Sequence, residues 1–148
     1  MSTPFQLIVP RAIYDDMIAQ ARSELPNECC GLLAGKIQEP GAEKQGPIVR
    51  VVRRFGLVNA AASPKEYLSD ARGMFEAERD RRRLGLEFVA VYHSHPTSPP
   101  VPSRTDLERN YSPDLMNLII SLQDGQPQVR AWWLSEKDFR EADWHIGE

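Results

Sequence analysis

Residues 88–92, Phe-Val-Ala-Val-Tyr, form an uninterrupted apolar run of about the length of one strand. A strand that faces water on one side alternates apolar and polar residues, whereas a strand covered on both faces does not alternate. The run therefore predicts a central strand with other elements packed on each side of its sheet. A sheet of this kind needs neighbouring strands and covering helices, so the rest of the chain must supply both.

Two helices are predicted to cover the sheet. The first begins at Pro10, whose missing N–H costs nothing in a first helical turn, and it ends at Pro26-Asn27. The second begins at the capping sequence 63–66, Ser-Pro-Lys-Glu, and runs to about Leu84. Apolar residues recur at helical spacing in both segments: Ile13, Met17 and Ala21, then Tyr67, Ala71, Met74 and Phe75.

The remaining patterns predict strands and one short helix. Ser103 and Asp106 bracket the short helix, which follows a proline-rich segment. The resulting order of elements is β, α, β, β, α, β, short α, β, β, which predicts an α+β fold of α/β/α-like layers around a single mixed sheet. All 148 residues are expected to form one domain. The further strands are 5–9, a hairpin of 29–37 and 48–52 around a Pro/Gly-rich turn, and 118–122 and 129–134 around Asp124-Gly125.

Composition excludes several classes of function. The chain has 18 Lys and Arg against 21 Asp and Glu, a net charge of −3, which argues against a nucleic-acid partner. No apolar stretch approaches the roughly 20 residues that span a bilayer, and no leader pattern opens the chain. The adjacent Cys29 and Cys30 are predicted to be small core residues in a reducing compartment. A cytoplasmic protein without a membrane partner is expected.

His93 and His95 follow the central run directly. Because side chains alternate along a strand, both imidazoles leave the same face of the sheet. On this spacing alone, a hydrogen-bonded pair is a commoner arrangement than a pair of metal ligands. A catalytic zinc ion takes three protein ligands, however, and a carboxylate is an accepted partner for two histidines. The pair thus predicts a metal site only if a third ligand reaches it.

Asp106 is the candidate for that third ligand. It lies in the first turn of the short helix, after the proline-rich segment 96–102, whose prolines reduce the conformational freedom lost when the loop folds back. Ser103 and Asp106 also fit a Ser-x-x-Asp helix cap, in which neither residue needs a metal. The residues by themselves leave both interpretations open.

The combination of these motifs resembles the signature of the JAMM (MPN+/Mov34/PAD-1-like) metalloprotease family. The signature covers His-Ser-His-Pro at 93–96, six intervening residues, Ser103 and Asp106. The segment 28–33, Glu-Cys-Cys-Gly-Leu-Leu, resembles the family's early glutamate with its Cys-Gly and aliphatic residues. The predicted order of elements also resembles that fold over nearly the whole chain. The short length is similar to the prokaryotic type, which lacks the insertions of eukaryotic relatives.

The resemblance implies one zinc ion per chain, held by His93, His95 and Asp106 at the end of the central strand. It also implies that Glu28 acts as general acid and base and that Ser103 stabilises the oxyanion. The local sequence by itself predicts that Glu28 is a solvated turn residue. Glu24 is the nearest competitor, but it falls in the last turn of a surface helix.

The implied activity is hydrolysis of the amide bond after the C-terminal Gly-Gly of a ubiquitin-like or sulfur-carrier protein. A metal-free scaffold of the same fold, acting as a protein-interaction module, is the alternative, and the intact ligand set argues against it. Other zinc hydrolases fit less well, because Pro96 follows the histidines where metallo-β-lactamases continue into Asp-His, and the cysteine motif of deaminases is absent. Whether the chain forms a homodimer stays open.

Overall fold

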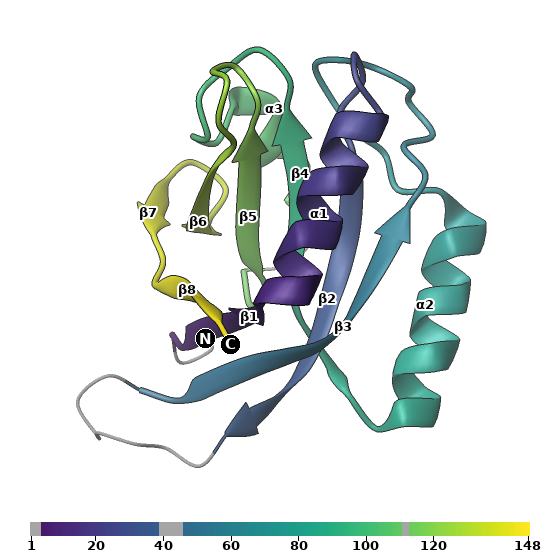
Figure 1. The fold of residues 1–148 in the computed structure, drawn as a ribbon, viewed down its shortest axis with the longest axis vertical. Helices are drawn as coiled ribbons and strands as arrows, with labels where there is room; N and C mark the ends of the chain where they lie inside the picture. Colours follow the sequence, from purple (N-terminus) through teal and green to yellow (C-terminus); the bar gives the residue numbers. More distant parts are fainter. Residues whose placement is uncertain (1–3, 39–45, 111–112) are drawn as a thin grey trace.

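The computed structural model describes residues 4–38, 46–110 and 113–148, which form three helices and one eight-stranded sheet (Figure 1). The Pro/Gly-rich turn expected between the hairpin strands lies mostly outside the described residues. The elements in chain order are β1 (Gln6–Pro10), α1 (Arg11–Ser23), β2 (Cys30–Gln38), β3 (Ile48–Leu57), α2 (Ala71–Leu84), β4 (Glu87–His95), α3 (Arg104–Glu108), β5 (Met116–Ser121), β6 (Gln128–Leu134), β7 (Phe139–Glu141) and β8 (Trp144–Gly147).

The sheet is mixed, and its strand order is β7-β6-β5-β4-β2-β3-β1-β8. The expected hairpin is present, since β2 pairs antiparallel with both β3 and β4. β4 and β5 are parallel neighbours, as are β3 and β1. The apolar run 88–92 thus lies in the central strand β4, with three strands on one side and four on the other. The expected α+β class is confirmed.

The two faces of the sheet are covered by different helices. The alternation along β4 decides which residues meet which helix: Ala90 and Tyr92 pack in the cluster that contains Met17 of α1. Val91 packs instead in the cluster that contains Ala77 of α2. α3 lies on the same face of the sheet as α2, and its Leu107 packs against β5 and β6. From Ala90 onward, where the pairing with β2 is regular, a side chain at an odd position of β4 therefore points to the face that carries α2 and α3.

The start of the second helix differs from the sequence-based prediction. α2 begins at Ala71, and the carboxylate of Asp70 caps it, whereas the hydroxyl of Ser63 only accepts from the main chain two residues later. The predicted cap failed because the buried side chain of Asn59 holds the intervening segment in an extended loop. Its amide bonds to four main-chain groups, those of Glu28, Ala61, Glu66 and Leu68.

Two strands at the C-terminal end were not predicted from the sequence. β7 pairs with β6, and β8 pairs in parallel with β1, so two segments close in sequence occupy opposite edges of the sheet. The two residues between them form hydrogen bonds with strands at both edges of the sheet. Ala142 N donates to Ala131 O of β6, and Leu7 N of β1 donates to Asp143 O. The sheet therefore curls until its edges nearly meet around α1, as Figure 1 shows.

Both cysteines are buried and free, as predicted for core residues. Burial raises the pKa of Cys29 to about 12 and that of Cys30 to about 11, so both thiols stay protonated at neutral pH. They belong to different apolar clusters on opposite faces of the sheet.

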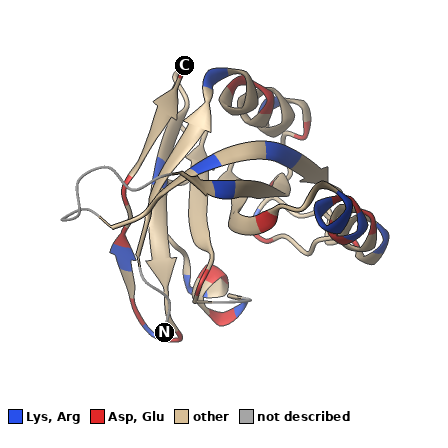
Figure 2. Ribbon diagram, turned by 90° about the horizontal axis from the view of Figure 1, so that it is seen from below, with Lys and Arg blue, Asp and Glu red and all other residues tan. Residues whose placement is uncertain are grey.

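The surface of the protein carries mixed charges. Lys and Arg lie beside Asp and Glu along the helices in Figure 2, and α2 ends in arginines paired with Glu78 and Asp80. Among the described helices, none has the length and apolar character needed to cross a bilayer.

Candidate metal centre

The two histidines of β4 point toward α3 and are almost completely buried. The intervening Ser94 faces the other way, where its hydroxyl accepts a hydrogen bond of 2.8 Å from Cys29 N, and Ser94 N donates to Cys29 O. These two bonds fix the end of β4 against the start of β2. The Nε2 atoms of His93 and His95 lie 3.2 Å apart, so the strand brings both imidazoles to one point.

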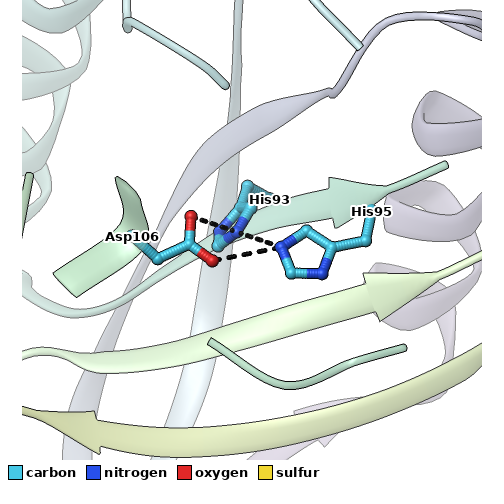
Figure 3. A group of neighbouring side chains, drawn as sticks. All are labelled: His93, His95 and Asp106. Atoms are coloured by element: carbon cyan, nitrogen blue, oxygen red, sulfur yellow. Dashed lines mark hydrogen bonds and ion pairs between the residues drawn. The ribbon is translucent and has the colours of Figure 1, made fainter. Parts of the chain in front are cut away.

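Asp106 reaches the same point from α3. The carboxylate oxygens lie 3.1 Å from the two histidine Nε2 atoms, Oδ1 by His93 and Oδ2 by His95 (Figure 3). Asp106 also takes part in the predicted capping box, in which Ser103 N donates to its Oδ2 and its own N–H donates to the Ser103 hydroxyl. The capping interpretation and the metal-ligand interpretation are therefore compatible, because the cap fixes the carboxylate beside the imidazoles.

The proline-rich loop between β4 and α3 is held by bonds from its neighbours. Ser121 Oγ donates to Ser98 O, and Trp132 Nε1 donates to Pro100 O at 2.9 Å. The carbonyl of Pro99 lies 2.8 Å from His95 Nδ1, which orients this imidazole with its Nε2 toward Asp106. The loop thus positions the carboxylate and also fixes the tautomer of one histidine.

The electrostatics of the cluster favour an ionised carboxylate. Burial by itself would raise the pKa of Asp106, but the contacts with His93 and His95 outweigh it and hold the pKa well below its usual range. Burial would likewise lower the pKa of His95, whereas its hydrogen bond to Asp106 raises it. The carboxylate of Asp106 therefore stays ionised although it is buried.

This donor set fits a metal ion. One ligand atom from each of His93, His95 and Asp106 lies within 4.8 Å of the others, and all three residues are buried. Two imidazoles and one carboxylate are a donor set found in catalytic zinc sites, where the fourth position takes water. Removing three polar side chains from water without a common partner costs free energy, which a bound cation would offset.

Glu28 lies two residues before β2, and it is only 3% exposed. Its pKa is raised to about 8, chiefly by burial; the charge of His95 lowers it, and those of Asp106 and Glu66 raise it. Its Oε1 has no hydrogen-bond partner among the described residues. Glu28 is not among the residues whose ligand atoms converge, so it lies near the metal ligands without joining them.

We predict that Glu28→Gln stabilises the metal-free protein in a pH-dependent way. A folded-state pKa near 8 and an unfolded value near 4.5 mean that ionisation destabilises the fold progressively as pH rises between these values. The gain in unfolding free energy of the variant over the wild type should therefore be small near pH 4.5 and largest above pH 8, about 5 kcal/mol at most. Urea titrations of both EDTA-treated proteins at pH 5, 7 and 9 test this, and a gain that does not grow with pH would contradict it.

Ser103 is the last residue that the sequence singled out. It is half-buried at the N-cap of α3, where its Oγ accepts from Asp106 N at 3.1 Å. The hydroxyl proton is not used in this bond. Ser103 therefore lies directly beside a metal ligand and retains a donor that could serve a second acceptor.

Two residues of the site were missed in the sequence. The ring of Tyr67, predicted on an apolar helix stripe, instead stacks on His93 with ring centroids 4.8 Å apart and an interplanar angle of 26°. Asn59, which had no role in the prediction, donates from Nδ2 to the carbonyl of Glu28 at 3.0 Å. No local pattern marks either residue, because both act through contacts with distant segments.

The fold and the site together define an α+β domain in which two histidines and an aspartate form a site able to bind a metal ion. Residues 10–135 match the family described as prokaryotic homologs of the JAB domain, and the chain belongs to this family. The resemblance inferred from the motifs is therefore confirmed.

Several relatives carry the names of enzymes. The CysO-cysteine peptidase of Mycobacterium tuberculosis is 30% identical over 82% of this chain and 77% of its own. A desampylase of Pyrococcus furiosus is 33% identical over 89% of this chain and 84% of its own. The solution structure of a protein from Desulfitobacterium hafniense is 31% identical, with a TM-score of 0.83 over 96% of this chain and 93% of that one. The expectation that the chain is an enzyme of the peptidase class is confirmed.

Proposed function

We propose that this protein is a zinc-dependent peptidase that cleaves the amide bond after the C-terminal Gly-Gly of a ubiquitin-like or sulfur-carrier protein. The observation that carries the proposal is the convergence of His93, His95 and Asp106 beside the buried carboxyl of Glu28. The two relatives named above support the substrate class, since one is named for CysO-cysteine and the other is a desampylase. We also propose that residues 1–148 act as a single catalytic domain.

In this proposal His93, His95 and Asp106 hold the metal. A zinc ion bound by such ligands activates water near neutral pH and polarises a carbonyl. Glu28 accepts a proton from the attacking water and delivers it to the leaving amine, a role that its raised pKa suits, because a group with a pKa near the working pH can both accept and release a proton. The hydroxyl of Ser103 donates to the developing oxyanion.

The burial of the metal ligands favours a slender substrate tail. His93, His95 and Asp106 are buried, with α3 and the loop that carries Tyr67 packed beside them. Two glycines have no side chains beyond Cα, so an extended Gly-Gly segment brings its carbonyl close to the ligands with little steric hindrance. A bulky residue at either position would meet the residues around the histidines.

The proposed cleavage can be tested with an intact substrate. A small ubiquitin-like carrier extended by one or more residues past its Gly-Gly terminus should be cut directly after the second glycine by the zinc-loaded protein. Intact-mass spectrometry should show the loss of the extension, and a carrier with Gly-Gly replaced by Val-Val serves as the matched control. Cleavage at another bond, or equal cleavage of the Val-Val carrier, would contradict the proposed specificity.

The metal-free scaffold is the second candidate function. It requires that the protein purify without metal after growth with zinc, and that it bind a carrier without cutting it. The buried, convergent donors favour the enzyme. Burying three polar side chains at one point is unfavourable unless they share a partner, and a scaffold without metal does not supply one.

A further inference from the structure

The two histidines differ in what holds their second ring nitrogen. Nδ1 of His95 lies 2.8 Å from the carbonyl of Pro99. Nδ1 of His93 is buried and has no hydrogen-bond partner among the described residues. A histidine that binds a metal normally uses its other nitrogen for a hydrogen bond, which fixes the orientation of the ring. A different contact must therefore orient His93.

The ring of Tyr67 makes that contact. It lies nearly parallel to the imidazole of His93, with the centroids 4.8 Å apart and 26° between the planes. The edge of His95 meets the same imidazole at 5.0 Å and 61°. Rotation of the His93 side chain would break the stacked arrangement, so Tyr67 restricts the direction in which Nε2 points.

Tyr67 is itself held by bonds on both sides of it. Asn59 Nδ2 donates to Glu66 O at 3.0 Å, and Leu68 N donates to Asn59 Oδ1 at 2.9 Å. The carboxylate of Glu66 also forms an ion pair of 2.9 Å with Arg109 at the end of α3. Because the residues before and after it are fixed in this way, Tyr67 is a preorganised contact and not a mobile surface ring.

We propose that Tyr67 is a positioning residue that orients His93 for metal binding by stacking on it, since no described residue forms a hydrogen bond with Nδ1. The proposal rests on the metal site of the proposed function and adds a residue to it. Asn59 connects the two parts, since the amide that fixes the neighbours of Tyr67 also donates to the carbonyl of Glu28. The 59–69 segment thus supports one metal ligand and the proposed base together.

Simple packing is the competing explanation, because Tyr67 also borders the apolar cluster under α2. The two explanations give different results. If Tyr67 only packs, its loss lowers the stability of the protein and leaves the affinity of the folded protein for zinc unchanged. If Tyr67 positions His93, loss of its ring weakens zinc binding. A substitution that keeps an aromatic ring, such as phenylalanine, then preserves the affinity for zinc.

The test compares Tyr67→Leu with the conservative Tyr67→Phe. Zinc dissociation constants of the metal-free proteins are measured by competition with a chromogenic chelator. We expect binding that is roughly 10-fold to 100-fold weaker in Tyr67→Leu, the range found when the partner of a ligating histidine is removed, and near wild type in Tyr67→Phe. Tyr14→Leu is the matched control, because it removes a tyrosine stacked on Trp144 at the opposite face of the sheet. Its zinc affinity should not change.

NMR spectra of the same metal-free proteins provide a readout independent of zinc. The ring protons of His93 should carry an upfield ring-current shift in the wild type and in Tyr67→Phe, and lose it in Tyr67→Leu. Unchanged zinc affinity in Tyr67→Leu would overturn the proposal, as would the absence of that ring-current shift in the wild type. If the leucine variant does not fold, Tyr67→Met takes its place. His93→Ala separates an error in the role of Tyr67 from an error in the metal site itself. If His93 is not a zinc ligand, this variant binds zinc as tightly as the wild type.

Discussion

Replacing His93 or His95 with alanine is expected to abolish zinc binding and peptide hydrolysis together. The remaining histidine and Asp106 would supply only two protein ligands, and two ligands do not hold a catalytic zinc ion well. Loss of either imidazole also leaves the carboxylate of Asp106 with one fewer partner in a buried place. Elemental analysis of the purified variants and the carrier-cleavage assay measure the two effects.

His145→Ala is the matched control for these variants, because His145 is an exposed histidine on the edge strand β8 and far from β4 in the strand order. It should retain one zinc per chain and full activity. Melting temperatures of the metal-free proteins separate a local loss of ligand from a loss of fold, which matters for His95, since it also contacts Pro99. Full zinc occupancy in both His93→Ala and His95→Ala would refute the assigned ligands.

The parts of the molecule that could be predicted from the sequence are those encoded locally. The apolar run 88–92 identifies the central strand, and the period of two along it brings His93 and His95 to one face. The cap formed by Ser103 and Asp106 is equally local, because both partners lie within one helical turn. These local signals define two pairs of polar residues, and the resemblance to the family is what joins the two pairs in one site.

The parts that were mispredicted depend on distant contacts. Ser63 and Pro64 form a plausible helix start, but hydrogen bonds from Asn59 compete with it and keep Tyr67 in a loop. The two C-terminal strands are three and four residues long and have little pattern of their own. They form because β1 and β6 offer unpaired edges, which a single sequence does not reveal.

The same distinction explains why the base was harder to predict than the ligands. Glu28 is a turn residue with no periodic pattern, and its burial arises from β4, α3 and the 59–69 segment meeting around it. That burial is also what raises its pKa to about 8. The property that makes the carboxyl useful as a proton acceptor is therefore tertiary, whereas the spacing of the histidines is local.

Glu28→Gln is expected to lower kcat by roughly 10²-fold to 10⁴-fold while zinc content and fold remain those of the wild type. The amide has the size of the carboxylate and can still form hydrogen bonds, but it cannot accept a proton from the attacking water. KM should change little, because Glu28 is not among the converging metal ligands and its proposed role begins only when the proton moves. Zinc content and steady-state kinetics are measured on one preparation.

Glu24→Gln is the matched control, because Glu24 lies four residues earlier, just after α1, and its carboxylate accepts from Gln20 away from the site. This variant should cleave the carrier at the wild-type rate. If Glu28 were instead a zinc ligand, Glu28→Gln would lose metal, and if it were only a buried turn residue, kcat would stay near wild type. The combination of full zinc content with a large fall in kcat distinguishes a proton-transfer role from both of these outcomes, since neither ligation nor packing predicts it.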